Sequence, residues 1–205
     1  MAARDAVVTA LADQLVALAR RAYHLGLTVG TSGNLSARIP GTERVLIKAS
    51  GQSLGDMTAA DTLLVDLDGQ LREPPTAGQR PSREVPFHLA IYRARPDVGA
   101  VIHLHPPHVL AFAAVHELPP LLTGASRVYL GDRMALIPVA ASGSAELAGH
   151  VARAFQNPKI LAAIMAEHGS ITAGPDLPAA FYLSQYLEDA ARTAILAKLW
   201  RVRSD

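Results

Sequence analysis

The chain has 205 residues and a formal net charge of +1, with 19 Lys and Arg residues against 18 Asp and Glu residues. Half of the residues are hydrophobic and 18% are charged, which excludes disorder for most of the chain and favours one folded domain over residues 1–205. The balanced charge argues against a general nucleic-acid-binding surface, and the absence of cysteine excludes disulfides, thiolate zinc sites and cysteine nucleophiles.

Helical spacing of apolar residues predicts a first helix, with Val7, Leu11 and Leu15 on one face and Gly26 at its C-terminal end. The Asp68-Gly69 turn indicates a hairpin, and therefore some antiparallel pairing. A polar loop rich in Pro and Gly is expected at 72–81. Strands are predicted at about 35–39, 45–48, 63–67, 98–105, 134–139 and 160–165, and further helices at about 82–95, 107–115, 144–155 and 177–200.

These elements alternate along the chain, so the fold class is mixed α/β, with no visible domain boundary. The longest apolar runs are short and interrupted by Gly, His or charged residues, and no membrane-spanning segment is expected. The beginning of the chain lacks the pattern of a signal peptide, so a cytoplasmic location is expected. The eight histidines are the unusual feature, and they point to metal or acid–base chemistry.

Two of these histidines, His103 and His105, lie at the end of a predicted strand, just before Pro106. Side chains two residues apart on a strand share a face, so both imidazoles can reach one cation, at about 2.0–2.1 Å for each Zn–N bond. The pair is a weak motif by itself, because two hydrogen-bonded strand histidines without a metal have the same spacing.

His168 is a third candidate ligand. It follows the apolar run at 160–165 and precedes Gly169, which again places a histidine at a strand end beside a residue that lets backbone approach closely. One type of catalytic zinc site uses three protein nitrogens and leaves one position open. The alternative is a lone histidine that ends a strand and binds nothing.

Glu84 is the candidate acidic residue. Ser82 is expected to cap a helix whose first turn contains Glu84, and a carboxylate is favourable there beside the helix dipole. First-turn glutamates are common and usually solvated, so this position alone does not establish a function. His88 follows four residues later and is expected to pair with Glu84.

Two short turns offer hydrogen-bond donors to an anion. They are Gly30-Thr31-Ser32-Gly33-Asn34 and, at the end of a predicted strand, Ala49-Ser50-Gly51. Glycine lets backbone N–H groups face an anion, and the polar side chains add donors. Neither turn has the spacing of a Walker loop or a dinucleotide fingerprint, and each can also be an ordinary turn.

Taken in order, these segments resemble the class II sugar-phosphate aldolase and adducin-head family, whose members include L-fuculose-1-phosphate aldolase. The resemblance spans roughly residues 5–200 and rests on an ordered set of motifs rather than on any one of them. The motifs are GTSGNLS at 30–36, IKASG at 47–51, PSRE at 81–84, AVIHLH at 100–105 and EHG at 167–169.

The resemblance implies a three-layer α/β/α sandwich around a largely antiparallel sheet, and usually a homotetramer with sites at subunit borders. It also implies a divalent metal, generally zinc with manganese or cobalt possible, bound by His103, His105 and His168. Glu84 would be a metal ligand in the resting enzyme and the catalytic base once substrate displaces it. The implied phosphate-binding residues are Gly33, Asn34, Ser50, Gly51, Ser82 and Arg83.

The implied activity is a metal-dependent lyase that cleaves a small phosphorylated ketose by retro-aldol chemistry through a metal-stabilised enediolate. Three features depart from the family. Arg83 stands where a second serine is usual and could bind a phosphate or a substrate carboxylate, or point to solvent. Thr123 stands where the aldolases have a tyrosine that protonates the leaving aldehyde, with Tyr129 nearby but out of register. The aromatic C-terminal tail of some aldolases has no counterpart.

Other activities remain open on the same site. Decarboxylation of a 3-oxo sugar-acid phosphate, or dehydration of a methylthioribulose phosphate, uses similar chemistry. Epimerisation ranks low because the family's epimerases typically carry Asp at the position of Glu84. A non-catalytic scaffold, as in adducin heads, is the alternative from another functional class, and the intact set of His and Glu residues argues against it.

Overall fold

A seven-stranded sheet forms the middle layer of the molecule, in the order β3-β2-β1-β4-β7-β6-β5. The computed structural model describes residues 5–75 and 78–202. Within those ranges all strand pairings are antiparallel except the parallel pair β5 and β6. The strands are β1 (Asn34–Arg38), β2 (Arg44–Lys48), β3 (Thr62–Asp66), β4 (Ala100–Leu104), β5 (Met134–Ile137), β6 (Ala162–Met165) and β7 (Gly169–Gly174).

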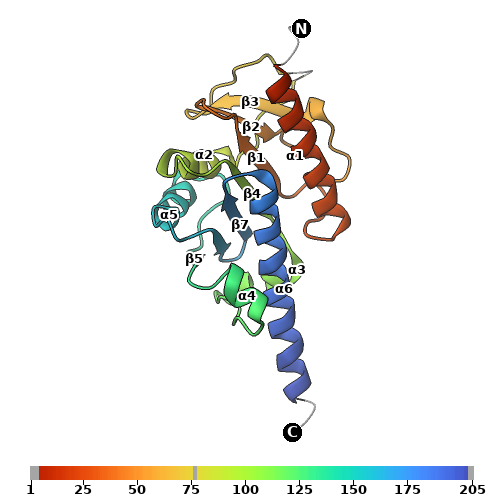
Figure 1. The fold of residues 1–205 in the computed structure, drawn as a ribbon, viewed down its shortest axis with the longest axis vertical. Helices are drawn as coiled ribbons and strands as arrows, with labels where there is room; N and C mark the ends of the chain where they lie inside the picture. The colour runs from red at the N-terminus through yellow and green to blue at the C-terminus, as the bar shows by residue number, and fades with distance from the viewer. Residues whose placement is uncertain (1–4, 76–77, 203–205) are drawn as a thin grey trace.

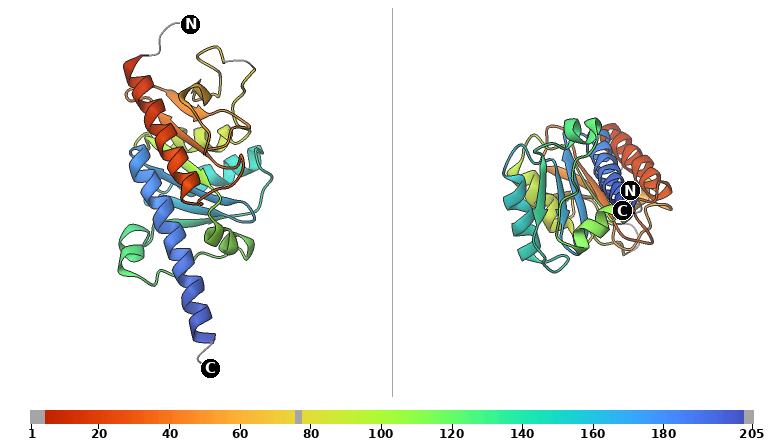
Figure 2. Two further views of the ribbon diagram at one scale, coloured as in Figure 1. Left: turned by 90° about the vertical axis from the view of Figure 1, so that its right-hand side faces the viewer. Right: turned by 90° about the horizontal axis from the view of Figure 1, so that it is seen from below.

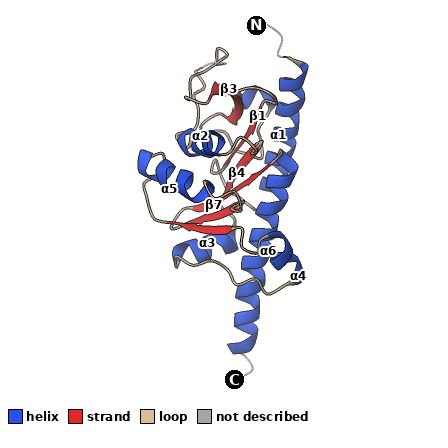
Figure 3. Ribbon diagram, turned by 60° about the vertical axis from the view of Figure 1, so that its left-hand side comes forward, coloured by secondary structure: helices blue, strands red, loops and turns tan. Residues whose placement is uncertain are grey.

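Helices cover both faces of the sheet, and the view from below in Figure 2 shows the resulting three layers. The helices are α1 (Ala6–His24), α2 (Val85–Ala94), α3 (Pro107–Ala114), α4 (Gly124–Tyr129), α5 (Ala145–Phe155) and α6 (Leu177–Val202), with a short 3-10 turn η1 (Ala59–Asp61). In Figure 3, α2 and α5 lie on one side of the strands, and α1 and α6 on the other. None of the described helices is both long and apolar enough to cross a lipid bilayer.

Each helix layer buries its own apolar cluster against the sheet. The α2–α5 layer includes Phe87 and Phe155, which are fully buried against strand residues such as Ile171. On the opposite face, Leu15 of α1 and Phe181 of α6 pack over β1 and its neighbours. Apolar burial on both faces is the dominant favourable term for a sheet of this kind.

The expected α/β/α sandwich with a largely antiparallel sheet is confirmed. The first helix ends as expected, because Gly26 takes a φ of +69° directly after it. The buried face of this helix differs in part from the predicted face, because small residues such as Ala12 and Ala19 are buried whereas Val7 is exposed. The expected hairpin is also present, and Leu71 returns to form an antiparallel bridge with Val65.

The sequence analysis missed β7, α4 and η1. β7 begins and ends with glycine and contains Ser170 and Thr172, so it lacks the apolar pattern of a strand. Small residues are needed there because α6 packs closely, and a Cβ atom on Gly174 would lie 2.8 Å from the Ala180 nitrogen. In the expected loop at 72–81, residues 76–77 lie outside the described ranges.

Candidate active site

The first two candidate ligands come from the centre of the sheet. β4 lies between β1 and β7, and His103 pairs with Asn34 on one side and with Ile171 on the other. His103 is fully buried, and His105 follows the end of the strand with part of its surface exposed. Their Nε2 atoms are 2.9 Å apart, so the two side chains share one face, as their spacing predicts.

His168 reaches the same place from the hairpin between β6 and β7. Glu167 takes a left-handed φ of +58° there, and the hairpin closes with Met165 opposite Gly169. The centre of the His168 ring lies 4.9 Å from that of His103 and 5.4 Å from that of His105. One ring nitrogen from each of the three histidines lies within 4.8 Å of the other two. Three imidazoles from two separate segments therefore converge.

Gly169 makes this convergence possible. A Cβ atom at this position would lie 2.7 Å from His105 Cδ2, 2.7 Å from the Leu104 carbonyl oxygen and 3.2 Å from His103 Cε1. The backbone oxygen cannot move without breaking the β4–β7 pairing. The close backbone approach predicted at Gly169 is present, and the glycine lies directly against two of the rings.

Glu84 completes the cluster from the start of α2. Its Oε1 lies 2.9 Å from His168 Nε2, and its Oε2 lies 3.3 Å from His103 Nε2. The expectation that Ser82 caps the helix and Glu84 sits in the first turn is wrong, because α2 begins at Val85 and Glu84 is the N-cap residue. Its carboxylate is drawn to the histidines instead of the helix N–H groups, so Ser82–Glu84 remains a turn.

The donor set fits a divalent cation. His103 Nδ1 lies 2.8 Å from the Ser170 carbonyl oxygen, so Nδ1 carries the proton and the lone pair of Nε2 faces Glu84 Oε2. Two acceptors that face each other are stabilised by a cation between them. Ligands of one tetrahedral zinc ion lie roughly 3.4 Å apart when each bond is about 2.1 Å. The separation of 3.3 Å between His103 Nε2 and Glu84 Oε2 is close to that spacing, and the two separations of 2.9 Å are shorter. His168 Nδ1 is buried with no hydrogen-bond partner.

The charge states also suit metal binding. Burial lowers the pKa of His103 to about 3, against the opposing effect of Glu84, and burial lowers the pKa of His105 as well. Both imidazoles are therefore neutral near pH 7, which is the form that binds metals. Burial is the largest single influence and would raise the pKa of Glu84, but the hydrogen bonds from His168 and Ser142 and the electrostatic effect of His103 together outweigh it, and the pKa lies well below its usual range. Glu84 is consequently an ionised carboxylate.

Asn34, one of the expected phosphate-binding residues, contacts the acidic residue. Its Nδ2 donates a hydrogen bond of 2.7 Å to Glu84 Oε2, and its Oδ1 accepts a hydrogen bond from His88. The expected pairing of His88 with Glu84 is therefore wrong. The α2 backbone directs His88 into the core toward β1, where Asn34 separates the imidazole from the carboxylate.

The two donor turns meet near Ser82. Ala49 forms an antiparallel bridge with Pro81, and the Ser50 nitrogen donates to the Arg80 carbonyl, which holds the second turn beside the segment before α2. Ser50 and Gly51 are exposed, and Ser82 is partly buried. On the other side, Gly33 takes a φ of +79° and packs against the His103 carbonyl oxygen. The expected anion-binding residues Ser50, Gly51 and Ser82 thus lie on two segments that are joined directly, and Gly33 lies against the strand that carries His103.

Lys48 was not identified from the sequence, although a lysine within an apolar strand is a recognisable signal. It is buried at 2% exposure, and its Nζ donates to the Thr31 carbonyl oxygen in the glycine-rich turn. Burial lowers its pKa to about 8, while Glu84 acts in the opposite direction. Lys48 therefore places a buried positive charge between the two donor turns.

Ser142 was also missed. It lies in the loop between β5 and α5, and its hydroxyl donates a hydrogen bond of 2.8 Å to Glu84 Oε1. Its sequence context has no periodicity or motif that could have indicated this contact. The same loop supports Arg83, whose Cβ and Cγ atoms lie beside Gly143.

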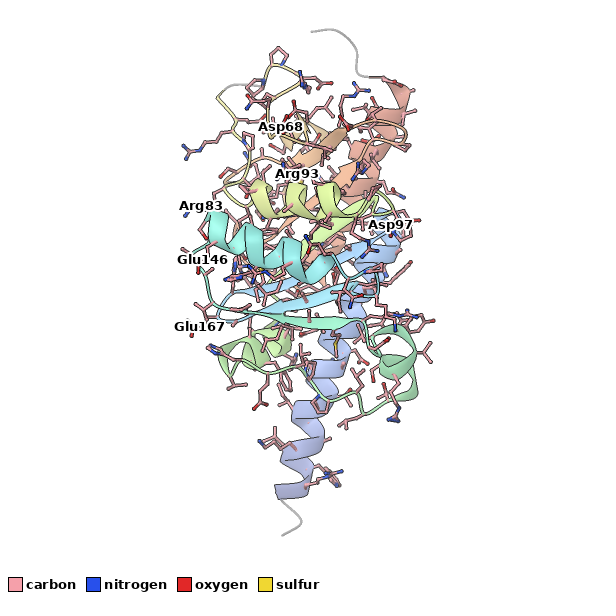
Figure 4. All side chains as sticks on the ribbon, turned by 90° about the vertical axis from the view of Figure 1, so that its left-hand side faces the viewer. Asp68, Arg83, Arg93, Asp97, Glu146 and Glu167 are labelled. Carbon is pink, nitrogen blue, oxygen red and sulfur yellow. The ribbon has the colours of Figure 1, made fainter. Side chains whose placement is uncertain are left out.

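The structure also places the three residues discussed above where the sequence differs from the family pattern. Arg83 is exposed, and Figure 4 shows it on the same side of the molecule as Glu167, the residue before His168. Thr123 caps α4, accepting a hydrogen bond of 3.1 Å from the Ser126 nitrogen. Tyr129 stacks on Tyr186 of α6 at a ring distance of 4.0 Å.

We expect Gly169→Ala to disrupt the histidine cluster. The added methyl group meets the Leu104 carbonyl oxygen and the His105 ring, so the substitution should cost about 1–3 kcal/mol of stability as overpacking. It should also weaken zinc binding by roughly tenfold or more, because the ring must turn. Thermal unfolding and competition with a chelator measure the two effects.

Gly149→Ala is the matched control. Gly149 lies in α5, and a Cβ atom there has nothing within 4 Å. This substitution should raise stability by about 0.5–1 kcal/mol, since alanine is a better helix former, and should leave zinc affinity unchanged. Equal zinc affinity in both variants would show that Gly169 does not shape the site.

A family model described as the class II aldolase and adducin N-terminal domain matches residues 13–195. The chain is 32% identical over 184 residues to a 3-oxo-tetronate 4-phosphate decarboxylase of Haemophilus influenzae, covering 88% of this chain and 84% of that protein. It is 35% identical over 182 residues to a 5-methylthioribulose-1-phosphate/5-deoxyribulose-1-phosphate aldolase of Rhodospirillum rubrum, covering 89% and 79% respectively.

Solved structures show the same fold. An L-fuculose 1-phosphate aldolase superposes with a TM-score of 0.84 at 26% identity, covering 94% of this chain and 88% of that one. The L-fuculose-1-phosphate aldolase of Thermus thermophilus gives a TM-score of 0.77 at 26% identity, covering 96% and 97%. The chain belongs to the class II aldolase and adducin N-terminal domain family.

Proposed function

We propose that the protein is a metal-dependent lyase that cleaves a small phosphorylated ketose by retro-aldol chemistry. His103, His105 and His168 would bind the cation, which we propose to be zinc, with manganese or cobalt as alternatives. The observation that carries the proposal is the convergence of three ring nitrogens within 4.8 Å of one another beside an ionised Glu84. A lone structural histidine needs no such arrangement.

A bound divalent cation would supply Lewis acidity toward negative charge that develops on the substrate oxygens. Glu84 supplies the proton chemistry. Retro-aldol cleavage removes a proton from the hydroxyl group that becomes the aldehyde and returns a proton to the carbon that loses its partner. An ionised Glu84 would accept the first proton and deliver it to that carbon. Asn34 and Ser142 hold one oxygen of Glu84 each, at 2.7 and 2.8 Å, so the carboxylate is oriented before substrate arrives.

The phosphate would bind at the entrance formed by the two donor turns. Its proposed partners are Gly33, Asn34, Ser50, Gly51, Ser82 and Arg83. Lys48 adds a buried positive charge beside them. Binding energy from a phosphate distant from the breaking bond holds the reacting atoms in place, which contributes to the rate rather than only to affinity.

Decarboxylation of a 3-oxo sugar-acid phosphate is the second candidate function. A decarboxylase of this substrate class is among the relatives, at 32% identity. Arg83 is exposed beside Glu84, where its guanidinium can bind a substrate carboxylate. The two candidates use the same metal and acid–base groups and differ in which bond breaks.

We further propose a homotetramer. The last turns of α6 extend beyond the rest of the fold in Figure 1 and carry exposed apolar side chains, with Leu196 at 52%, Leu199 at 57% and Trp200 at 75% exposure. A projecting helix with this surface is typical of an interface with another protein chain. Light scattering on the purified protein measures the mass directly, and a monomer would contradict the proposal.

A product analysis separates the two candidate functions. The zinc-loaded protein is incubated with phosphorylated ketoses and with 3-oxo-acid phosphates, with and without a chelator. Retro-aldol cleavage should yield an aldehyde and a shorter phosphorylated ketone, whereas decarboxylation should release carbon dioxide. Turnover that is unaffected by the chelator would contradict the proposed metal dependence.

Substitution of a ligand tests the metal site. His103→Ala should lose both stoichiometric zinc and activity, because a three-nitrogen site retains only two imidazoles. His168→Ala, at a less buried position, should show the same loss if His103→Ala folds poorly. His150→Ala is the control, since His150 is a partly buried histidine on α5 outside the cluster. Unchanged zinc content in both ligand variants would overturn the ligand assignment.

Glu84→Gln tests the acid–base role. The amide preserves size and leaves the fold intact but cannot exchange a proton, so kcat should fall by about 10²–10⁴-fold. Glu146→Gln is the control, because Glu146 is an exposed carboxylate on α5, labelled in Figure 4. Thermal unfolding verifies the fold, and a wild-type rate in Glu84→Gln would remove this residue from the mechanism.

A further inference from the structure

A continuous buried polar chain leads from Glu84 into the core beneath α2. In order, it consists of Glu84, Asn34, His88, Ser36 and Tyr92. Asn34 Nδ2 lies 2.7 Å from Glu84 Oε2, and Asn34 Oδ1 is hydrogen-bonded to His88 Nε2. His88 Nδ1 lies 2.7 Å from Ser36 Oγ, which lies 2.9 Å from the Tyr92 hydroxyl.

The members of this chain are shielded from water. His88 and Ser36 are both 0% exposed, Tyr92 is 1% exposed and Asn34 is 3% exposed. His88 also stacks on Phe87, with ring centres 4.8 Å apart. A buried polar network of this kind is costly unless every donor has an acceptor, so its hydrogen bonds must follow one consistent direction.

The direction is determined at the Glu84 end. Asn34 Nδ2 donates to Glu84 Oε2, so the amide turns its carbonyl oxygen toward His88. The carbonyl oxygen requires a donor, which makes Nε2 the protonated nitrogen of His88. Neutral imidazole carries one proton, and His88 Nδ1 is therefore an acceptor.

The remaining bonds follow from that tautomer. Ser36 must donate its only hydroxyl proton to His88 Nδ1, and Tyr92 must then donate to Ser36. Burial lowers the pKa of His88 to about 3, which keeps the ring neutral and compatible with this pattern. A charged ring would carry a proton on both nitrogens, so its Nδ1 could not accept the hydrogen bond from Ser36.

We infer that His88 is a positioning residue that holds the Asn34 amide in the one orientation that donates to Glu84. With the amide reversed, its carbonyl oxygen would face the carboxylate at hydrogen-bond distance and repel it. Glu84 would then turn away from His103 and His168. The role in turnover rests on the proposed function, whereas the orientation of Asn34 and the tautomer of His88 do not.

The first experiment is ¹⁵N NMR of the His88 ring in the zinc-loaded protein, repeated after chelation. The expected result is a neutral ring protonated at Nε2 throughout about pH 5–8, the range in which an ordinary histidine titrates. A ring protonated at Nδ1, or one that becomes charged within this range, overturns the inference. This readout requires neither metal nor substrate.

The second experiment measures the consequence for Glu84. His88→Leu removes the donor to Asn34 and should lower kcat by about 10–100-fold, with KM changed less than about twofold, and should weaken zinc binding. His88→Gln restores an N–H donor and should recover most of the loss. A folded His88→Leu protein with wild-type kcat and zinc affinity contradicts the positioning role.

Ser36→Ala is the second variant if His88→Leu does not fold. It removes the hydroxyl that donates to His88 Nδ1, so the ring is free to adopt the other tautomer, and kcat should fall severalfold. Ser184→Ala is the matched control, because Ser184 is 1% exposed and bonds to Thr172 on the opposite face of the sheet. Equal losses in both serine variants would indicate a general effect of destabilisation and overturn the inference.

These outcomes separate the inference from the proposed function. A wild-type protein that binds no zinc and cleaves no substrate contradicts the proposed function, and the NMR result still decides the orientation of Asn34. An active wild-type protein with the Nδ1-protonated ring keeps the proposed function and rejects the role of His88.

Discussion

The hydrogen bond from His103 Nδ1 to the Ser170 carbonyl oxygen is the interaction on which the site depends. It joins two adjacent central strands, and its length of 2.8 Å is set by their pairing. Because this bond uses the ring proton, the lone pair of Nε2 must point at Glu84 Oε2 and at His105. The sheet therefore makes His103 Nε2 and Glu84 Oε2 facing acceptors, and a cation between them would stabilise the pair.

The central position of His103 imposes demands on its neighbours. Its strand is paired on both sides, so the backbone around it cannot move, and small residues have to provide the space. A Cβ atom on Gly33 would lie 3.1 Å from the His103 carbonyl oxygen, and one on Gly169 would lie 3.2 Å from its ring. Gly33 belongs to a turn that was predicted to bind an anion, whereas Gly169 was predicted to allow a close backbone approach, and both accommodate the buried imidazole.

The sequence was sufficient for features that follow from local spacing, and insufficient for features that depend on tertiary contacts. The shared face of His103 and His105 follows from strand geometry alone, and the α/β/α fold follows from the alternation of elements and the family motifs. The hairpin that carries His168 depends on β7, whose glycines and polar residues conceal a strand. The start of α2 was misplaced because Ser82 has the chemistry of a helix cap, whereas tertiary contacts to Glu84 determine the observed turn. The contacts of Ser142 and His88 with Glu84 and Asn34 join residues more than fifty positions apart, and no local pattern encodes them.

The two oxygens of Glu84 occupy different environments, and the difference bears on the proposed chemistry. Oε2 faces inward, where Asn34 is 3% exposed and the buried polar chain continues behind it. Oε1 lies 2.9 Å from His168 Nε2 and accepts a hydrogen bond from the hydroxyl of Ser142, an exposed residue. The buried amide of Asn34 maintains the orientation of the carboxylate, while the hydroxyl of an exposed serine can rotate and give up its contact to substrate. In the proposed reaction, Oε1 is therefore the atom that carries the proton, and Oε2 is the anchor that keeps the acid–base group in place between cleavage and protonation.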